Sequence, residues 1–371
     1  MYKRGVLPSQ RVRFASGTPG FHQIVRQRVD AYFEDRDLSR HADAKAVAKI
    51  CFWLLSASGI YLGLISSTLP GLFVVVLGFS IAQVGFNVGH DAIHRATSKH
   101  SWVNEVLGWT FDLFGGSSYA WNLAHNVVHH TYTNMPGVDH DIDSEPWMHF
   151  HAHEKVARYY RWQHVFAFGY YALTMLAWTF VKDFTQLSAR DPRTLKRTEF
   201  RGWVGMFIGK AAHLTVFIGL PMIFYAGPWW KVLIGYLLMQ MMVGFALAIV
   251  FQLAHVVEGP AFPKADADGM LSHTWAEHQL HTTANFSTGG ALATFLTGGL
   301  NHQIEHHLFP KISHTHYGAL SEIVRQTAAE HGLPYHENRS FFSAVGSHIR
   351  TMRRFGMVPD ERTALAGVTA R

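Results

Sequence analysis

The apolar residues of the chain are concentrated in two pairs of long runs. Residues 47–67 and 70–88 form the first pair, and residues 204–226 and 229–254 form the second. Each run has about the 20 residues that an α-helix needs to cross the hydrocarbon core of a bilayer. Because only a few residues separate the two runs of each pair, the pattern predicts two transmembrane helical hairpins, with four spans in all.

Histidines cluster just beyond these runs or in the segments that follow them. The motifs HDAIH, HNVVHH and QIEHH each hold two or three imidazoles within one or two helical turns, and a further histidine ends the fourth run. Buried imidazoles are costly unless something binds them, and a metal ion satisfies several of them together. The single cysteine, Cys51, lies inside an apolar run, so thiolate ligation is not available. The candidate metal ligands are His90, His94, His125, His129, His130, His255, His306 and His307.

Other polar residues near these motifs are further candidates, either as ligands or as partners of the ligands. They are Gln303, His281, Asp91 and Glu305. Of the remaining histidines, those at 149, 151 and 153 alternate in a segment without ligand-like context. We expect His149, His151 and His153 not to bind a metal.

An acidic loop follows the second motif. Asp139, Asp141 and Asp143 resemble the opening of a calcium-binding loop, but Phe150 stands where such a loop requires a glutamate. We therefore expect a solvated loop, or carboxylates that accept hydrogen bonds from the ring N–H groups of metal ligands.

All the histidine clusters must lie on one side of the membrane to form one site. Two hairpins satisfy this condition, whereas a fifth crossing at residues 163–182 would place the last cluster opposite the earlier ones. We therefore expect residues 163–182, although apolar enough to span, to lie at the interface or to insert only partly. Residues 107–122 are aromatic but too short to span, and they are expected at the interface as well.

Composition and charge indicate the class of protein and its orientation. Of the 371 residues only 16% are charged, whereas soluble proteins carry about a quarter. The net charge of +6 is explained more simply by anionic lipid headgroups than by nucleic acid. Residues 1–45, with a helix expected around 21–35, lack the apolar core of a signal peptide. This segment, the basic loop 182–201 and a basic tail at 341–371 are predicted to be cytosolic under the positive-inside rule.

The pattern thus predicts an all-α integral membrane protein with four spans, interfacial helices and a cytosolic, histidine-rich cap. The membrane domain is expected to cover residues 46–340. Eight imidazoles exceed the four ligands of a structural zinc site, so two metal ions fit the count. A site floored by apolar helices suits a long apolar substrate with a polar head. Attack on an unactivated C–H bond requires a redox metal and an oxidant, which indicates iron with O2.

These motifs resemble the three histidine boxes of the membrane fatty acid desaturases. HDAIH, HNVVHH followed by TYTN, and QIEHHLFP carry the resemblance, which extends from about residue 71 to residue 335. The third box, which begins with Gln303, is similar to that of the front-end group, which includes Δ5 and Δ6 desaturases. The resemblance implies a di-iron centre held by the eight histidines. It also implies O2 and two electrons as co-substrates, and a cis double bond introduced into a long-chain acyl-CoA or acyl-lipid.

Two features depart from the family pattern. Many front-end enzymes carry a fused cytochrome b5 domain with an HPGG motif, which does not occur here, and residues 1–45 are too few for such a domain. We therefore expect a separate electron donor, a ferredoxin or a cytochrome b5-like protein with its reductase. The second departure is Gln303, where other desaturases have a histidine. Because an amide is a poorer iron ligand, Gln303 can bind through its oxygen, through water, or not at all.

Three alternatives stay open on the sequence. Hydroxylases and related monooxygenases share the histidine architecture and differ in whether oxygen is transferred to the carbon, although QIEHH favours desaturation. A metal transporter would place its ligands near the midplane of the bilayer, whereas these histidines flank the spans. A non-catalytic membrane protein would leave the ligand spacing unexplained.

Overall fold

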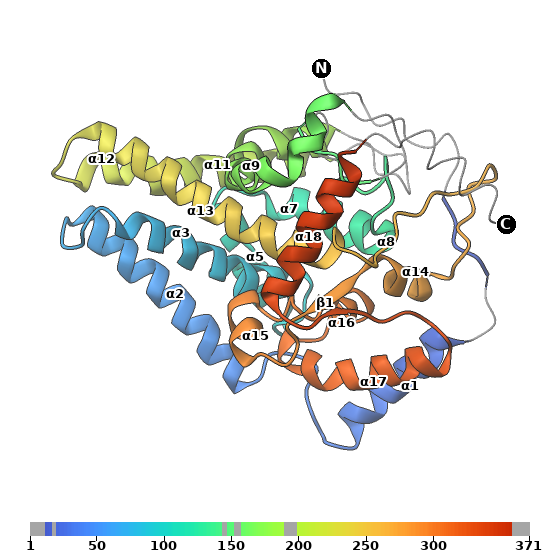
Figure 1. The fold of residues 1–371 in the computed structure, drawn as a ribbon. Helices are drawn as coiled ribbons and strands as arrows, with labels where there is room; N and C mark the ends of the chain where they lie inside the picture. The colour runs from blue at the N-terminus through green and yellow to red at the C-terminus, as the bar shows by residue number, and fades with distance from the viewer. Residues whose placement is uncertain (1–11, 17–19, 143–146, 152–156, 189–198, 358–371) are drawn as a thin grey trace.

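Two helical hairpins form the apolar half of the molecule in the computed structural model (Figure 1). The first consists of α2 (Ala44–Ile65) and a continuous helix built from α3 (Phe73–Val84), η1 (Gly85–Gly89) and α4 (His90–Ile93). The second consists of α11 (Phe200–Leu214), η5 (Thr215–Gly219), α12 (Leu220–Phe224) and α13 (Trp229–His255). These bounds agree with the four predicted runs to within a few residues.

The structure describes residues 12–16, 20–142, 147–151, 157–188 and 199–357. Asp143 and His153, and the tail beyond residue 357, lie outside these ranges. The remaining helices are α1 (Phe21–Glu34), α5 (Ser101–Gly108), α6 (Thr110–Leu113), α7 (Ser118–Trp121), η2 (Asn122–His129), α8 (His130–Tyr132), η3 (Arg158–Trp162), α9 (Gln163–Ala177), η4 (Trp178–Lys182), α10 (Asp183–Ser188), α14 (Trp275–Thr282), α15 (Ala291–Thr297), α16 (Gln303–Leu308), η6 (His314–His316), α17 (Tyr317–Glu330) and α18 (Phe341–Phe355).

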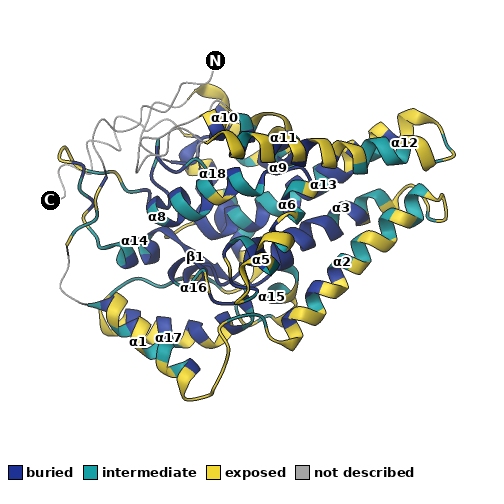
Figure 2. Cartoon of the chain, turned by 180° about the vertical axis from the view of Figure 1, so that it is seen from behind, coloured by how far each residue is buried: buried dark blue, intermediate teal, exposed yellow. Residues whose placement is uncertain are grey.

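Among the described residues, five helices are long and apolar enough to cross a membrane. Four are the predicted spans, and the fifth is Arg158–Ser188, which contains the stretch 163–182 that we expected at the interface. Only 6% of the most apolar window of α2 is buried inside the protein, against 72% for Phe73–Ile93. The helix that carries the first histidine motif is therefore the inner member of its hairpin, and α2 is an outer one (Figure 2).

Helix α9 packs along the part of α13 that lies nearest to the histidines. Gln240 of α13 donates a hydrogen bond to Thr179, and the Gly244 carbonyl accepts one from Thr174. Beyond these contacts, Tyr171 reaches His348, which in turn contacts the Val256 carbonyl. The hydrogen bonds of α9 and of η4, which continues it, thus reach α13 from Gln240 to its end.

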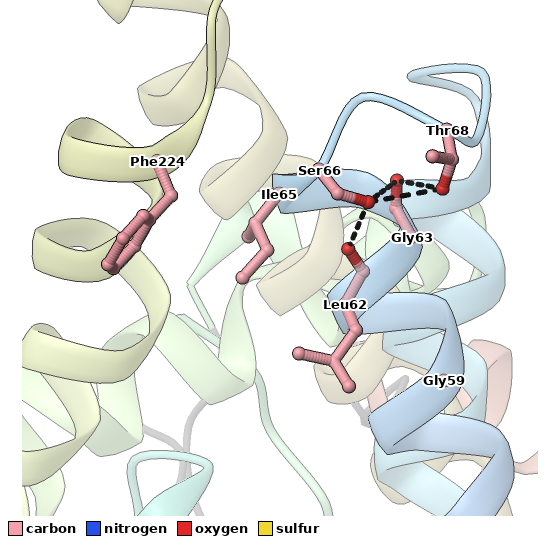
Figure 3. Close-up of a pocket in the computed structure, with 7 residues that line it drawn as sticks. All are labelled: Gly59, Leu62, Gly63, Ile65, Ser66, Thr68 and Phe224. Carbon is pink, nitrogen blue, oxygen red and sulfur yellow. Dashed lines mark hydrogen bonds between the residues drawn. The ribbon is translucent and has the colours of Figure 1, made fainter.

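The two hairpins meet through a close approach of α3 and α13. A Cβ atom on Gly78 would lie 2.5 Å from the carbonyl oxygen of Met239, so only glycine permits this distance. Leu77, Ile81 and Val243 form the apolar core beside it. Near the turns of the two hairpins, a hollow of about 620 Å³ lies between Leu62 of α2 and Phe224 of α12 (Figure 3).

The aromatic stretch near residue 110 forms short helices that expose one apolar face. Trp102, Val106, Trp109 and Leu113 follow the i, i+3/i+4 spacing of a single face, and all four are exposed. The apolar face thus begins five residues before the predicted range 107–122. Such a stripe is typical of a helix that lies in the membrane interface.

The rest of the chain forms a cap on the histidine end of the hairpins. Two short parallel strands, β1 (Ala284–Phe286) and β2 (His336–Asn338), depart from the all-α expectation. Helices α1 and α17 pack together, and Arg28 of α1 donates a hydrogen bond to Thr327 of α17. Residues 341–355, expected to belong to a basic tail, form α18, whose buried face packs against α9.

Candidate metal centre

The first histidine motif is carried by a change of helical winding. After α3, the chain forms the π-helical segment η1 and then α4, which presents His90 and His94. A Cβ atom on Gly89 would lie 2.4 Å from the ring of Phe111, so glycine is needed where η1 passes α6. π-Helical turns often occur at functional sites, because they change the direction in which the following side chains point.

The second motif is also π-helical. Ser117 caps α7 by accepting a hydrogen bond from the Ala120 amide, and η2 then carries His125 and His129. After the motif, buried Asn134 adopts a positive φ of 57°. Its side-chain amide donates to the carbonyls of His255 and Thr282. This residue therefore ties the end of the second motif to the end of α13.

The third motif lies on the short helix α16, which is held against η1. Gly298 has a positive φ of 62°, and a Cβ atom there would lie 2.4 Å from the carbonyl oxygen of Phe86. The chain between α15 and α16 therefore packs directly on the backbone of η1. This contact places His306 and His307 beside the first motif, although more than 200 residues separate them in sequence.

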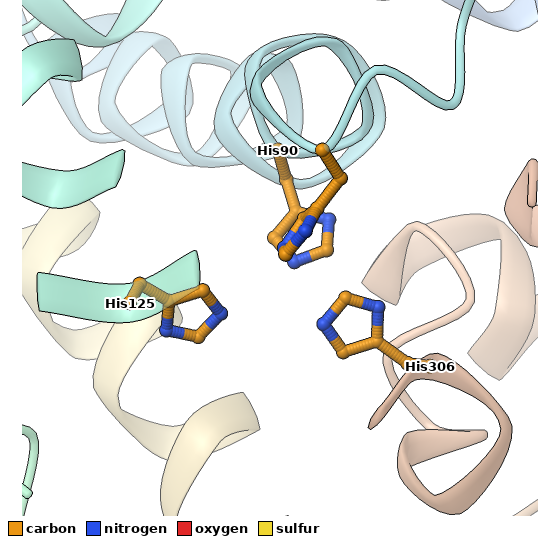
Figure 4. Close-up of side chains that lie close together, drawn as sticks. His90, His125 and His306 are labelled. Atoms are coloured by element: carbon orange, nitrogen blue, oxygen red, sulfur yellow. The ribbon is translucent and has the colours of Figure 1, made fainter. Parts of the chain in front are cut away.

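The eight candidate histidines are all buried. Their ring nitrogens form two groups, and within each group these atoms lie no more than 4.8 Å apart. The first group comprises His90, His94, His125 and His306; the labelled rings in Figure 4 point toward one another from three different elements. The second group comprises His129, His255 and His307.

His130 lies between the two groups. Its Nε2 is 3.3 Å from Nε2 of His125 in the first group. Its ring stacks on that of His307 in the second group, with the centroids 4.3 Å apart. The structure thus brings all eight predicted residues into one cluster with two centres.

The inward-facing nitrogens fit the requirements of a metal centre. The buried Nε2 atoms without a hydrogen-bond partner among the described residues include those of His90, His94, His129, His306 and His307. Buried polar atoms are rarely left without a partner, because the loss of water costs about 1–3 kcal/mol for each. Several such atoms aimed at two common points indicate ligands that satisfy them together. Neutral imidazoles with few carboxylates suit a transition metal such as iron or zinc.

Comparison with known proteins decides the family. The sequence model of the family described as "Fatty acid desaturase" matches residues 66–339. The chain is 34% identical over 364 residues to the sn-1 linoleoyl-lipid 6-desaturase of Synechocystis sp., and the match covers 95% of this chain and 99% of that protein. The chain belongs to the fatty acid desaturase family. It is therefore an oxidoreductase that desaturates fatty acyl chains, as its histidine motifs predicted.

Two further relatives are also named as desaturases of lipid-linked acyl chains. The sn-1 linoleoyl-lipid 6-desaturase of Arthrospira platensis is 32% identical, over 92% of this chain and 94% of the relative. The acyl-lipid (8-3)-desaturase of Physcomitrium patens is also 32% identical, over 91% of this chain and 72% of the relative.

The acidic loop of the desaturase forms hydrogen bonds to two histidines of the second motif. Asp139 Oδ2 lies 2.8 Å from His129 Nδ1, and Asp141 Oδ2 lies 3.1 Å from His125 Nδ1. In both contacts the ring N–H donates to the carboxylate, which leaves Nε2 free to face inward. The predicted role of these carboxylates as acceptors for ring N–H groups is confirmed, while Asp143 lies outside the described residues.

Asp91, a further candidate from the sequence, also contacts a ligand ring from the outside. Its Oδ1 lies 3.3 Å from His90 Nδ1, and its Oδ2 lies 2.6 Å from Nδ1 of His314. His314 belongs to η6 and was not expected at the site. The carboxylate therefore links the first motif to a segment that follows the third one.

Several other partners of the ligand rings were missed by sequence reasoning. Gln279 Oε1 lies 2.9 Å from His307 Nδ1, and the Tyr317 hydroxyl lies 3.2 Å from His306 Nδ1. Lys182 donates a hydrogen bond of 2.9 Å to Asp141. Gln279 and Lys182 are distant in sequence from the groups they contact, and no local spacing marks them. Only the HTH triplet at 314–316, close behind the third motif, was a usable signal.

Several of the clustered histidines lie outside the membrane helices. Burial keeps most of these imidazoles in the neutral form. It lowers the pKa of His125 to about 3 and holds the pKa of His94 and His306 well below its usual range. His129 differs, because although burial lowers its pKa, the carboxylate of Asp139 outweighs that effect and raises it. Neutral rings are the form that binds a metal.

The remaining candidates occupy different positions. The amide nitrogen of Gln303 lies 3.1 Å from His255 Nε2, and its buried Oε1 has no partner among the described residues, so Gln303 borders the second group. Glu305 points away and accepts hydrogen bonds from Asn285 and Tyr335. Burial raises the pKa of Glu305 to about 7.

The histidines outside the eight are separate from the two groups. His281 joins neither group, and its ring stacks on that of His273 at 4.2 Å. His149 and His151 contact each other at 4.6 Å and are also absent from both groups. The structure therefore gives no support to His281 as a ninth ligand.

Proposed function

We propose that the desaturase introduces a cis double bond at position 6 of an acyl chain that is carried by a membrane lipid. The observation that carries this proposal is the match along almost the whole chain to two relatives named sn-1 linoleoyl-lipid 6-desaturase. Other relatives are also named for acyl-lipid substrates. Lipid-linked chains are therefore favoured over acyl-CoA.

The two groups of histidines are the residues that would hold two iron ions. The first ion would take His90, His94, His125 and His306, and the second would take His129, His255 and His307, with His130 between them. Gln303 lies where its amide oxygen could complete the second site. The unpaired, inward-facing nitrogens support this assignment.

Iron at these sites supplies the redox chemistry by which O2, two electrons and two protons remove two hydrogen atoms from adjacent carbons and give two water molecules. The side chains of the desaturase orient the ligands and keep them in the form that binds. Asp139 and Asp141 hold their rings by accepting the outer N–H. Burial of the cluster excludes bulk water, which limits competing reactions of the oxidant.

A four-span topology would place the whole site on the cytosolic face. Both hairpin turns lie at the same end of the molecule, opposite the histidine-rich cap (Figure 1). The hydrogen bonds of α9 and η4 to α13 lie at Gln240 and Gly244, in the half of α13 that leads to His255, which supports an interfacial position for 163–182. The basic loop 182–201 supports a cytosolic orientation.

A separate carrier would supply the two electrons that the reaction consumes. A ferredoxin or a cytochrome b5-like protein with its reductase fits this role. A positively charged cytosolic face would favour association with an acidic carrier.

The experiment that tests the proposal measures whether the new double bond appears first in acyl-CoA or in glycerolipid. Membranes from expressing cells are incubated with radiolabelled linoleoyl-CoA and reduced carrier, and the acyl-CoA and glycerolipid fractions are sampled over time. We expect the 6-unsaturated product to appear first in glycerolipid, at the sn-1 position after lipase digestion. Its first appearance in acyl-CoA would contradict the lipid-linked substrate. Elemental analysis of the purified enzyme should give two irons for each chain, and zinc in their place would contradict the metal assignment.

A further inference from the structure

A basic hollow lies on the cap, away from the histidine cluster. It has a volume of about 360 Å³ and is lined by Arg158 and Arg161 of η3 and by Gly356 and Met357 at the end of α18. Both arginines are exposed. Their guanidinium groups can therefore meet a ligand from outside the protein.

The wall of this hollow is a fixed junction between two helices. A Cβ atom on Gly356 would lie 2.0 Å from the carbonyl oxygen of Tyr160, so the end of α18 packs directly on the backbone of η3. Gln163 strengthens the junction by donating a hydrogen bond of 2.8 Å to the carbonyl of Met352. The backbone that carries the arginines is therefore held in place by buried contacts.

The arginines of the hollow lack the acidic partners that other cap arginines have. Arg28 contacts Glu330 at 2.7 Å, and Arg350 contacts Glu258 at 2.6 Å. Among the residues that the structure describes, no carboxylate forms an ion pair with Arg158 or Arg161. An unpaired guanidinium is well suited to bind a phosphate through two parallel hydrogen bonds.

Two more positive charges lie beside the hollow. Arg353 and Arg354 occupy the last turn of α18, three and two residues before Gly356, and both are exposed. The guanidinium of Arg354 covers the ring of Phe355 and forms no ion pair with a described carboxylate. Clusters of four or more basic residues at a membrane surface attract anionic lipids.

The residues that follow the arginines indicate that this face meets the bilayer. Trp162 is 56% exposed and Val165 is 63% exposed, and exposed apolar side chains continue along α9 and into η4, as far as Phe180 and Val181. The order of arginine, tryptophan and then apolar residues is typical of a segment that enters the membrane interface. The guanidinium groups would then lie at the depth of the lipid phosphates.

We propose that Arg158 and Arg161 bind the phosphate of an anionic membrane phospholipid in this hollow and thereby anchor the cap at the bilayer surface. The site is separate from the metal centre, so this proposal does not depend on the identity of the acyl substrate. The chemistry it recognises is the phosphodiester of a glycerolipid whose headgroup carries no compensating cation. An acidic protein carrier could also be attracted to arginines, but the adjacent exposed apolar residues favour a lipid.

The test uses the full-length enzyme purified in a neutral detergent and stripped of lipid. Its thermal unfolding is followed while dioctanoyl phosphatidylglycerol, dioctanoyl phosphatidylcholine or inorganic phosphate is added. We expect phosphatidylglycerol to raise the unfolding temperature at roughly tenfold lower concentration than phosphatidylcholine. The double variant Arg158→Gln, Arg161→Gln should lose this preference.

A matched control removes the same charge elsewhere. Arg26→Gln with Arg36→Gln changes two exposed arginines on or just after α1, at the other end of the cap, and should keep the preference for phosphatidylglycerol. An unchanged response in the Arg158, Arg161 variant would overturn the proposal. Equal stabilisation by inorganic phosphate would overturn the lipid as the occupant. A raised KM for the reduced electron carrier, with phosphatidylglycerol binding intact, would assign the patch to the carrier instead.

Discussion

Asp139 accepts a hydrogen bond of 2.8 Å from the Nδ1–H of His129, and both side chains are fully inaccessible to solvent. The same carboxylate also accepts hydrogen bonds from the backbone amides of Asn134 and Asp141. Asp139 therefore fixes both the tautomer of His129 and the loop that follows the second motif. Carboxylates in this position are worth a large share of the affinity of a metal site.

The variant Asp139→Asn tests this relationship. The amide keeps the shape of the side chain but removes the charge that orients the imidazole. We expect iron affinity and desaturase activity to fall by roughly 10- to 100-fold. Chelator competition gives the affinity, and product formation gives the activity. The exposed residue Asp268 provides the control, since Asp268→Asn should match the wild type. A fully loaded and active Asp139→Asn enzyme would show that the hydrogen bond has no role in metal binding.

If the two histidine groups bind metal, removal of one histidine from either group should lower the metal content. His306→Ala removes a ligand from the first group, and His129→Ala removes one from the second. Both variants should remain in the membrane, lose activity and contain less iron. His151→Ala is the comparison, because His151 belongs to neither group. It should keep its iron and its activity, and an inactive His151→Ala enzyme would mean that the site extends beyond the eight rings.

The clustering of the eight histidines was predictable from the sequence because the information was local. The spacing of His90 and His94, and of His125 and His129, is enough to place each pair on one side of a helix, and the four long runs were predominantly apolar. The carboxylates at 139 and 141 were predictable because they follow the second motif closely.

Partners that depend on tertiary packing were not predictable in the same way. Gln279 reaches the His307 ring, and His314 reaches the Asp91 carboxylate, from segments that carry no periodic signal. His281 was expected as a further candidate because it lies in a polar, histidine-containing stretch, but that stretch folds so that its ring meets His273 instead. The π-helical winding of η1 and η2 could not be predicted either, because the i, i+4 spacing of the histidines does not distinguish a π-helix from an α-helix.

The place of Gln303 beside the second group leads to a third prediction. Gln303→Ala removes the amide, whose buried Oε1 has no partner among the described residues. We expect less iron bound at the second group than in the wild type, with the first group retained, so that the iron content falls from two toward one per chain. Gln303→His places a ring nitrogen at the same position and should retain more iron than the alanine variant. Equal iron content in wild type and Gln303→Ala would exclude the amide from metal binding.

A buried histidine in the cap predicts how stability changes with pH. His348 lies between two groups, with Nδ1 2.6 Å from the Val256 carbonyl and Nε2 2.7 Å from the Tyr171 hydroxyl. The neutral ring satisfies both contacts, donating to the carbonyl and accepting from the hydroxyl. Burial lowers the pKa of His348 from 6.5 to about 4.

Because this pKa is lower in the folded protein, the unfolded chain takes up the proton first as the pH falls. The contribution of His348 to stability is therefore present above pH 6.5 and is lost as the pH falls toward 4. Linkage gives a loss of about 2 kcal/mol between pH 7 and pH 5 from this group. His348→Gln has no titrating ring, so its free energy of unfolding should fall less over this interval. Chemical denaturation at the two pH values measures the difference, and identical pH dependence in both proteins would refute this role of His348.

The most direct test of the whole account is the fatty-acid profile of cells that express the desaturase with a ferredoxin system. Gas chromatography–mass spectrometry is compared with that of cells expressing His306→Ala. The account predicts a new acid with a cis double bond at position 6 that is absent in the variant. A hydroxy acid in its place, or the same unsaturated acid in the variant, would contradict it.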